Sequence, residues 1–298
     1  TFDNTAPTIS NVSIASDNAV TTLAKVGDKV TVSITSNEDL YDLSSVQVAG
    51  QSVDNALITK NSETSWSFGY VMTATDTEGD LGFTVTSNDL TGNPTTTTVA
   101  DNGSVLFDRT QPTLTAVSIS SNNAYDASLA TIGDVITVAF TSSETVQDPP
   151  TVTIGGTSAT VSGSGTSWSA ARTLTSSDAN GVIAFAVDFL DLASNAGTQV
   201  TSSTDGSTVT LDQTPPTLTA VAISSNNSTN SLAKIADSVS VAFTSSENIQ
   251  TPTATIGGAS ATVSGSGTSW TAKRAMVSGD SEGSVAFTVD FMDLVSNA

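Results

Sequence analysis

The sequence contains no cysteine and no histidine, and it has only eight lysine and arginine residues against 29 aspartates and glutamates. Without cysteine, disulfide bonds and thiol nucleophiles are excluded. Without histidine, the chain lacks the side chain that titrates near neutral pH unperturbed. The net charge of −21 leaves no cationic patch, so we exclude nucleic acids and anionic bilayer surfaces as partners.

Long apolar runs are also missing. No stretch approaches the roughly 18–20 residues that cross a bilayer, so we expect no membrane insertion in this segment. The sequence does not begin with a signal peptide, so we expect that a larger polypeptide carries the export signal or that the signal was removed. The acidic, lysine-poor and Ser/Thr-rich composition is typical of an exported protein that is exposed to salt or divalent cations.

A short motif occurs three times: Asp3-Asn-Thr-Ala-Pro7, Asp108-Arg-Thr-Gln-Pro112 and Asp212-Gln-Thr-Pro-Pro216, each followed by threonine. The steps of 105 and 104 residues are far longer than solenoid repeats, which indicates tandem copies of a whole domain. We predict domains over 1–107, 108–211 and 212–298, the third incomplete because it lacks its final strand. The prolines predict short, extended joints between them.

Apolar and polar residues alternate through each repeat, as at Ile136, Val138 and Phe140, and helical periodicity is absent. In the second repeat the pattern predicts strands over 112–119, 134–140, 151–154, 158–161, 168–174, 183–189 and 207–211. The parity slips between Leu114 and Val117, which predicts a bulge. Seven short strands in about 100 residues predict an all-β fold, with three seven-strand immunoglobulin-like sandwiches in a rod.

Each repeat has one tryptophan, and Trp66, Trp168 and Trp270 are 102 residues apart. We expect each to fill a core, although stacking on carbohydrate is an alternative. In the third repeat we expect Phe287 to point inward, as its equivalents do.

The strand directions bring three segments to one end of each sandwich: the joint, the loop after the second strand and the loop after the sixth. The predicted sets are Asp3, Glu38, Asp89 and Asn93; Asp108, Glu144, Asp191 and Asn195; and Asp212, Glu247, Asp293 and Asn297. Three carboxylates gathered together repel one another, so a cation is expected among them. Oxygen ligands without His or Cys select a hard cation, and we predict Ca²⁺, with Mg²⁺ as second choice.

The alternative is that these acids cap turns and keep the surface soluble. Arg109 could partly replace the ion at the second joint. Asp28, Asp134 and Asp237 recur at the opposite end, where we expect turn residues. Paired carboxylates can hydrolyse glycosides, but acids copied at three crowded linkers do not form a cleft, and we predict no enzymatic activity.

Four motifs recur: D-x-T-x-P-T at the joint, S-x-E or S-S-E after the second strand, G-T-S-W before the fifth and D-x-x-x-N after the sixth. They resemble bacterial Ig-like, cadherin-like tandem repeats of giant surface adhesins. The resemblance implies a secreted protein in an extracellular location at a bacterial cell surface. It also implies stacked modules that hold a ligand-binding tip away from the cell, with Ca²⁺ stiffening the linkers. Its D-x-x-G-N loop is kept at Gly92, whereas Ser194 and Ser296 replace the glycine.

We therefore predict a stalk segment of an adhesin, rigidified by Ca²⁺ between neighbouring repeats of the chain. One alternative is a subunit of a surface layer or filament, which takes a strand from other copies of itself. Another is a glycan-binding module that uses Tyr41, Tyr125 or a tryptophan.

Overall fold

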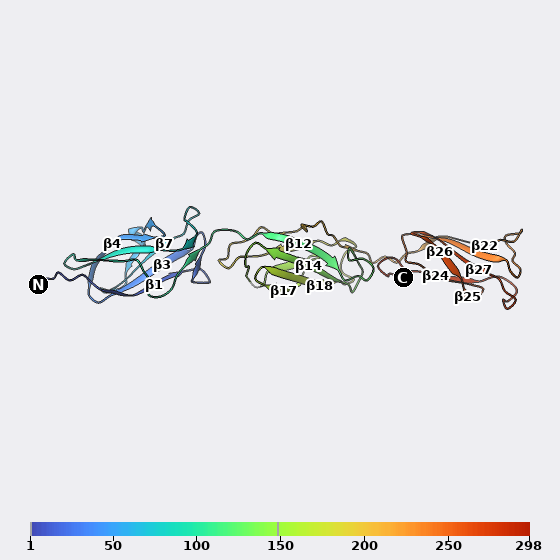
Figure 1. Ribbon diagram of the computed structural model, residues 1–298, viewed down its shortest axis with the longest axis horizontal. Coiled ribbons are helices and arrows are strands. Elements are labelled where there is room, and N and C mark those ends of the chain that lie inside the picture. Colours follow the sequence, from blue (N-terminus) through green and yellow to red (C-terminus); the bar gives the residue numbers. More distant parts are fainter. Residues whose placement is uncertain (1, 148) are drawn as a thin grey trace.

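The computed structural model describes residues 2–147 and 149–298, and its strands form three groups that lie end to end (Figure 1). We call them unit 1 (β1 to β11), unit 2 (β12 to β21) and unit 3 (β22 to β28). Each unit has its own cluster of buried apolar residues. The predicted all-β sandwich fold is confirmed. The exact domain boundaries stay a prediction, and Thr1 lies outside the described residues.

The strands of unit 1 are β1 (Ile9–Ser16), β2 (Leu23–Ala24), β3 (Lys29–Ser36), β4 (Leu40–Val48), β5 (Gln51–Ser52), β6 (Ile58–Lys60), β7 (Ser65–Val71), β8 (Gly79–Asp80), β9 (Phe83–Asp89), β10 (Pro94–Thr97) and β11 (Leu106–Phe107). Those of unit 2 are β12 (Leu114–Ser121), β13 (Leu129–Ala130), β14 (Val135–Ser142), β15 (Thr151–Ile154), β16 (Thr157–Ser158), β17 (Thr160–Ser164), β18 (Ser167–Thr173), β19 (Gly181–Val182), β20 (Phe185–Asp188) and β21 (Thr210–Leu211). Those of unit 3 are β22 (Leu218–Ser225), β23 (Ser238–Ser245), β24 (Thr253–Ile256), β25 (Ala259–Ser260), β26 (Thr262–Ser266), β27 (Ser269–Ala275) and β28 (Phe287–Asp290).

The helical content of the described residues is one short 3₁₀ helix, η1 (Asn55–Leu57). None of the described residues belongs to a helix with the length and apolar character needed to cross a membrane.

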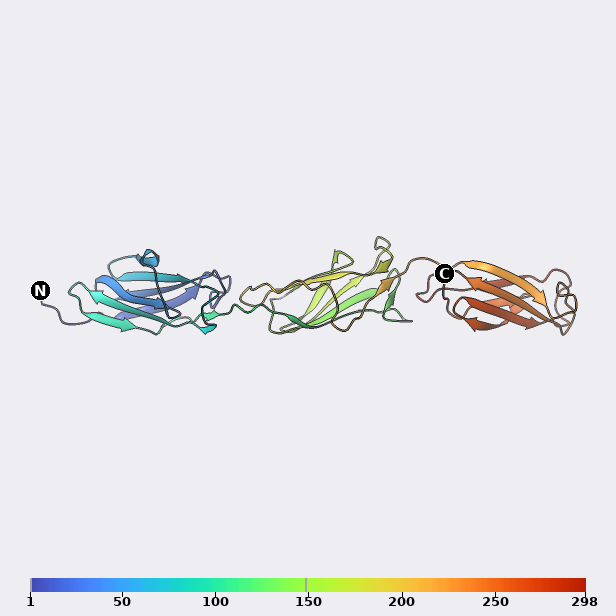
Figure 2. The ribbon, with the colours of Figure 1, turned by 90° about the horizontal axis from the view of Figure 1, so that it is seen from above.

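Each unit consists of two main antiparallel sheets (Figure 2). In unit 2 the sheet β12-β14-β18-β17 packs against the sheet β16-β15-β20, and both contribute to one apolar cluster. A third small sheet, β13-β21-β19, closes the base of the unit and contains a parallel pair, β13 with β21. Unit 1 has an equivalent small sheet, β2-β11-β8.

The alternating sequence pattern produces the core directly. Along β14 every second residue is buried, and Ile136, Val138 and Phe140 all point into the sandwich. Successive side chains of a strand point to opposite faces, so the intervening polar residues face solvent. Burying an apolar side chain of this size contributes about 1.5–3 kcal/mol.

The predicted slip in the first strand is present as a register shift between Leu114 and Ala116, and β1 and β22 have equivalent shifts. The last strand of unit 2 is shorter than the predicted 207–211, because regular pairing begins only at β21. Ahead of β21, side chains replace the backbone ladder: the Ile119 amide donates to Ser207 Oγ at 2.9 Å. Serine and threonine hydroxyls readily compete with backbone partners in this way.

Phe287, which we expected to point inward, is 38% exposed, whereas its counterpart Phe185 is 7% exposed. In unit 2 the fully buried Val209 bonds through its carbonyl to the Ile183 amide and closes this edge of the core. No described segment takes that position in unit 3, and Val221 on β22 is consequently 44% exposed.

The three tryptophans are core residues, as predicted. Trp168 is 3% exposed, and its indole Nε1 donates to the Gly165 carbonyl at 3.1 Å. Trp270 makes the same bond to Gly267 at 3.0 Å, and Trp66 is 9% exposed. Stacking of a sugar on these rings would require the cores to open.

We expect Trp168→Ala to lower the free energy of unfolding of unit 2 by about 3–5 kcal/mol, because it leaves a large cavity in the core. Denaturant unfolding followed by circular dichroism measures the change. Tyr125→Ala removes an aromatic side chain that is 58% exposed, and should stay within about 0.5 kcal/mol of the parent. Similar losses for both variants would contradict the core assignment.

Candidate metal centre at the unit junctions

Three carboxylates from three separate segments meet at one end of each unit. Within each group, one carboxylate oxygen per residue lies within 4.8 Å of the others. We name these groups the first cluster (Asp3, Glu38, Asp89), the second cluster (Asp108, Glu144, Asp191) and the third cluster (Asp212, Glu247, Asp293). The structure thus gathers all nine carboxylates that the strand directions had brought together.

The sandwich topology explains the second cluster. Asp108 follows β11 in the linker, Glu144 follows β14, and Asp191 lies just beyond β20. Strand β14 ends where β12 begins, because Ser142 pairs with Leu114. Val146, beyond β14, bridges Asp191, beyond β20, so both loops meet the linker at one end of unit 2. The Ser143 amide donates to the Thr113 carbonyl at 2.8 Å and joins the loop after β14 to the linker.

The aspartate in the loop after β20 is held rigidly. Asp191 is fully buried, and its two carboxylate oxygens accept from the Asn195 amide and from Asn195 Nδ2, each at 2.8 Å. Asn195 Nδ2 also donates to the Asp108 carbonyl at 3.0 Å. The predicted asparagines Asn93 and Asn297 bond their own aspartates in the same way. Each asparagine therefore braces its loop with the amide nitrogen toward the carboxylate.

Serine supports the same loop as glycine. Gly92 has a φ of 88°, and Ser194 and Ser296 adopt left-handed values of 70° and 76°. Such a conformation costs a residue other than glycine on the order of 1 kcal/mol. A hydrogen bond from Gln147 Nε2 to Ser194 Oγ at 2.8 Å offsets part of this cost. The departure from the glycine pattern therefore leaves the loop geometry intact.

The second cluster is electrostatically unfavourable by itself. Burial raises the pKa of Glu144, and the carboxylates of Asp108, Asp191 and Glu78 raise it further. Burial likewise raises the pKa of Asp108, with Asp191 and Glu78 adding to the effect. None of the described residues donates a hydrogen bond to the Glu144 carboxylate. A cation would therefore be stabilised strongly at this position.

The third cluster repeats this pattern and the first differs. Burial, and then the charges of Asp212 and Asp293, raise the pKa of Glu247. At the first cluster, burial opposes ionisation of Asp89, but hydrogen bonds from Asn93 and Thr91 outweigh it and hold the pKa at about 2. That carboxylate stays charged at any physiological pH.

Residues that sequence reasoning missed come from the base of the preceding unit. Asn18 Nδ2 donates to the Ala193 carbonyl at 2.9 Å, and Lys25 Nζ donates to the Ser194 carbonyl at 2.9 Å. Asp28 is the turn residue expected, because it accepts from the Lys25 amide. The bonds from Asn18 and Lys25 both reach the loop of unit 2 that presents Asp191 and Asn195.

Glu78 also joins the first junction, by which we mean the contact region between units 1 and 2. Its Oε1 accepts from the Arg109 amide at 2.9 Å and from Thr110 Oγ1 at 2.8 Å.

The sequence did contain a signal for the role of Asn18. Each repeat has an asparagine 10 or 11 residues before its recurring aspartate, which is Asp28 in unit 1. In a tandem array the base of one unit faces the top of the next, so these residues belong to the junction.

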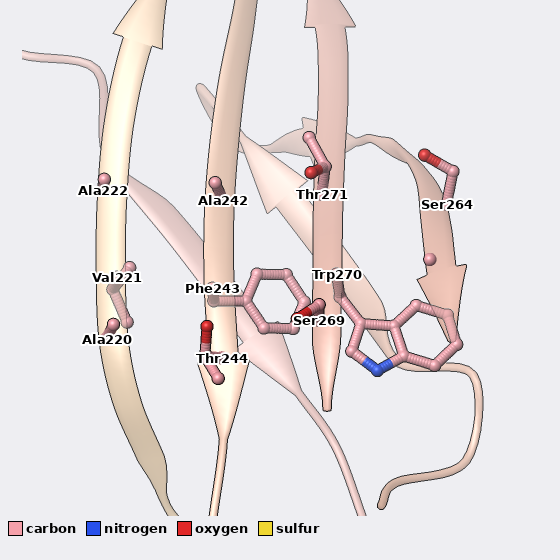
Figure 3. A pocket seen from close by; sticks show the side chains of 11 residues that line it. Ala220, Val221, Ala222, Ala242, Phe243, Thr244, Ser264, Ser269, Trp270 and Thr271 are labelled. Carbon is pink, nitrogen blue, oxygen red and sulfur yellow. The ribbon is translucent and has the colours of Figure 1, made fainter. Parts of the chain in front are cut away.

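A separate hollow lies on the sheet β22-β23-β27-β26 of unit 3 (Figure 3). Its lining is composed of small side chains such as Ala220, Ala222 and Ala242, with Phe243 and Trp270 below them in the core. No charged residue lines it. The hollow is shallow and has no feature of a site that selects a ligand.

We expect removal of divalent cations to give unit 2 an unusual pH dependence. The raised pKa values of Glu144 and Asp108 mean that the folded state binds more protons than the unfolded chain, so stability falls as pH rises through their range. In divalent-free buffer the melting temperature should therefore increase as the pH is lowered from 7 toward about 5. Calorimetry measures this slope.

Glu144→Gln removes one of the three repelling charges and should flatten that slope. Without divalent cations it should stabilise unit 2 by about 0.5–1 kcal/mol, as is usual for partly exposed charges. A variant that is less stable than the parent in the same buffer would show that the glutamate is held by favourable contacts instead.

The fold and the three clusters define a tandem array of β-sandwiches with acidic junctions. No protein-family model and no curated protein matches the chain. Solved structures do: one is from a 1.5-MDa bacterial ice-binding adhesin studied for host cell surface retention, with 17% identity, coverage of 98% of both chains and a TM-score of 0.42.

Another similar structure is a Ca²⁺-stabilised adhesin with which an Antarctic bacterium reaches out and binds ice, with 20% identity, coverage of 96% and 74%, and a TM-score of 0.41. A third is dimeric latent PorU from Porphyromonas gingivalis, with 8% identity, coverage of 94% and 30%, and a TM-score of 0.25. The first two come from bacterial surface adhesins, the class that the sequence motifs resemble.

Proposed function

We propose that this chain is a non-enzymatic stalk segment of a large bacterial surface adhesin, outside the cell, and that Ca²⁺ stiffens its junctions. The observation that carries the proposal is the position of the acidic clusters. The second and third clusters each combine a linker aspartate with two carboxylates of the following unit, within 4.8 Å. An ion bound there would fix the direction in which the linker enters the unit.

The chemistry of the ligands favours calcium. Each cluster offers oxygen ligands only, and Ca²⁺ takes six to eight oxygens from carboxylates, carbonyls and water. We propose the nine clustered carboxylates as ligands and the neighbouring asparagines, Asn93, Asn195 and Asn297, as the residues that orient the loop. Without the ion, the repelling charges would remain at the linker and would oppose its position against the unit.

The partners in this proposal are the neighbouring repeats of the same chain, with domains at 1–107, 108–211 and 212–298. A second candidate function is a subunit that accepts a strand from another copy. The exposed apolar side chains of Val221, Ile223 and Phe287 favour it. Small-angle scattering separates the two, because a stalk segment stays a monomeric rod and a strand acceptor forms polymers as concentration rises.

We expect 10 mM Ca²⁺ to stabilise the folded chain by about 1.4–2.7 kcal/mol per site, taking dissociation constants of about 10⁻⁴–10⁻³ M for extracellular sites. Asp108→Asn should remove most of this gain at the second cluster. Thermal unfolding with Ca²⁺ and with a chelator measures it, and isothermal titration calorimetry gives the stoichiometry.

Asp188→Asn is the matched control. It changes the same charge in the same unit, but Asp188 lies on β20 outside the cluster, where its carboxylate accepts a hydrogen bond from Gln199 Nε2. Its response to Ca²⁺ should equal that of the parent. An equal loss in both variants, or a parent that does not respond to Ca²⁺, would overturn the proposal.

A further inference from the structure

The two junctions are built from different residues at equivalent positions. Lys25 directly follows β2, and Thr131 directly follows β13. Arg109 follows the aspartate of the first linker, whereas Gln213 follows that of the second. The first junction therefore contains two protein cations, and the second junction, between units 2 and 3, has neutral side chains at both positions.

At the first junction, two bonds cross directly from unit 1 to the loop that carries Asp191. The bond from Asn18 Nδ2 to the Ala193 carbonyl is buried, and the bond from Lys25 Nζ to the Ser194 carbonyl is partly buried. The Lys25 bond is charge-assisted, and such bonds are roughly twice as strong as neutral ones. Arg109 also donates to the Ala74 carbonyl and fastens the linker to unit 1.

The second junction has a weaker counterpart. Thr131 Oγ1 donates to Asn297 Oδ1 at 2.9 Å, which is a neutral bond to a side chain. Asn18 and its equivalent Asn123 each donate to an aspartate of their own unit. Only Asn18 also donates across its junction, since no described residue of unit 3 accepts from Asn123. Gln213 Nε2 donates to the Asp178 carbonyl, and Asn180 bonds to the Gln213 amide and to Thr214 Oγ1. Among the described residues, the side-chain bonds that tie this linker to unit 2 are therefore neutral.

We propose that Asn18 and Lys25 form a latch that holds the first junction closed through protein contacts alone, and that the second junction is the hinge of the chain. The latch acts on the backbone of the loop itself, so it needs no ion at the second cluster. Without divalent cations, units 1 and 2 move as one body and unit 3 swings against them.

The chain has no native cysteine, so spin labels can be placed freely. Ser62, Ser164 and Ser266 are exposed, and the pairs Ser62→Cys/Ser164→Cys and Ser164→Cys/Ser266→Cys each span one junction. Pulsed electron–electron double resonance in the presence of a chelator should give a narrow distance distribution across the first junction and a broad one across the second. Equal widths would overturn the latch.

Exchange of the two junction residues supplies the matched variants. Lys25→Thr should broaden the distribution across the first junction, and Thr131→Lys should narrow it across the second. Lys29→Thr removes a lysine of unit 1 whose side chain makes no bond to a described residue of unit 2. This variant should leave both distance distributions unchanged. A Lys25→Thr variant that melts like the parent but keeps the narrow distribution would disprove the latch.

Repeating the distance measurement with Ca²⁺ tests this inference separately from the proposed function. Ca²⁺ should narrow the distribution across the second junction. If it changes neither distribution while the two junctions still differ in chelator, the latch stands and the metal proposal fails. If the two widths are equal in chelator and both narrow with Ca²⁺, the metal proposal stands and the latch fails.

Discussion

The structure depends on one topological constraint: the chain enters units 1 and 2 at one end and leaves each of them at the other (Figure 1). In unit 2, β12 starts beside the linker from unit 1, and β21 ends beside the linker to unit 3 (Figure 1). A unit that returned its chain to the same end would produce a compact pair of domains. Here the units can only extend along one axis, and each linker is forced between a base and a top.

The acidic clusters follow from this constraint. The linker aspartate arrives at the end of the sandwich where the loops after β14 and β20 already lie, so three carboxylates share a small volume. Their charges are held there by the fold and not by mutual attraction, since the pKa values of Glu144 and Asp108 are raised. Folding therefore stores an unfavourable interaction at each junction, and a bound cation would relieve it.

Much of the fold could be predicted from the sequence because strand patterning is local. The alternation through Ile136, Val138 and Phe140 identified β14, and the parity slip near Leu114 identified the bulge. The gathering of Asp108, Glu144 and Asp191 could also be predicted, because it needs only strand directions.

Other features depend on contacts between distant segments, which no local pattern reports. The exposure of Phe287 depends on the absence of a covering segment such as that around Val209. The orientation of Asn195, with nitrogen toward Asp191, depends on where the linker carbonyl lies. The contacts of Lys25 belong to a neighbouring unit and become visible only when both units are placed.

The three separate apolar cores have a mechanical consequence. A pull on the two ends of the chain loads the units in series, so every unit feels the same force and the weakest core ruptures first. Each rupture frees about 100 residues, which extend to roughly 350 Å at about 3.5 Å per residue. A chain loaded in this way would lengthen in discrete steps, and each rupture would dissipate part of the load.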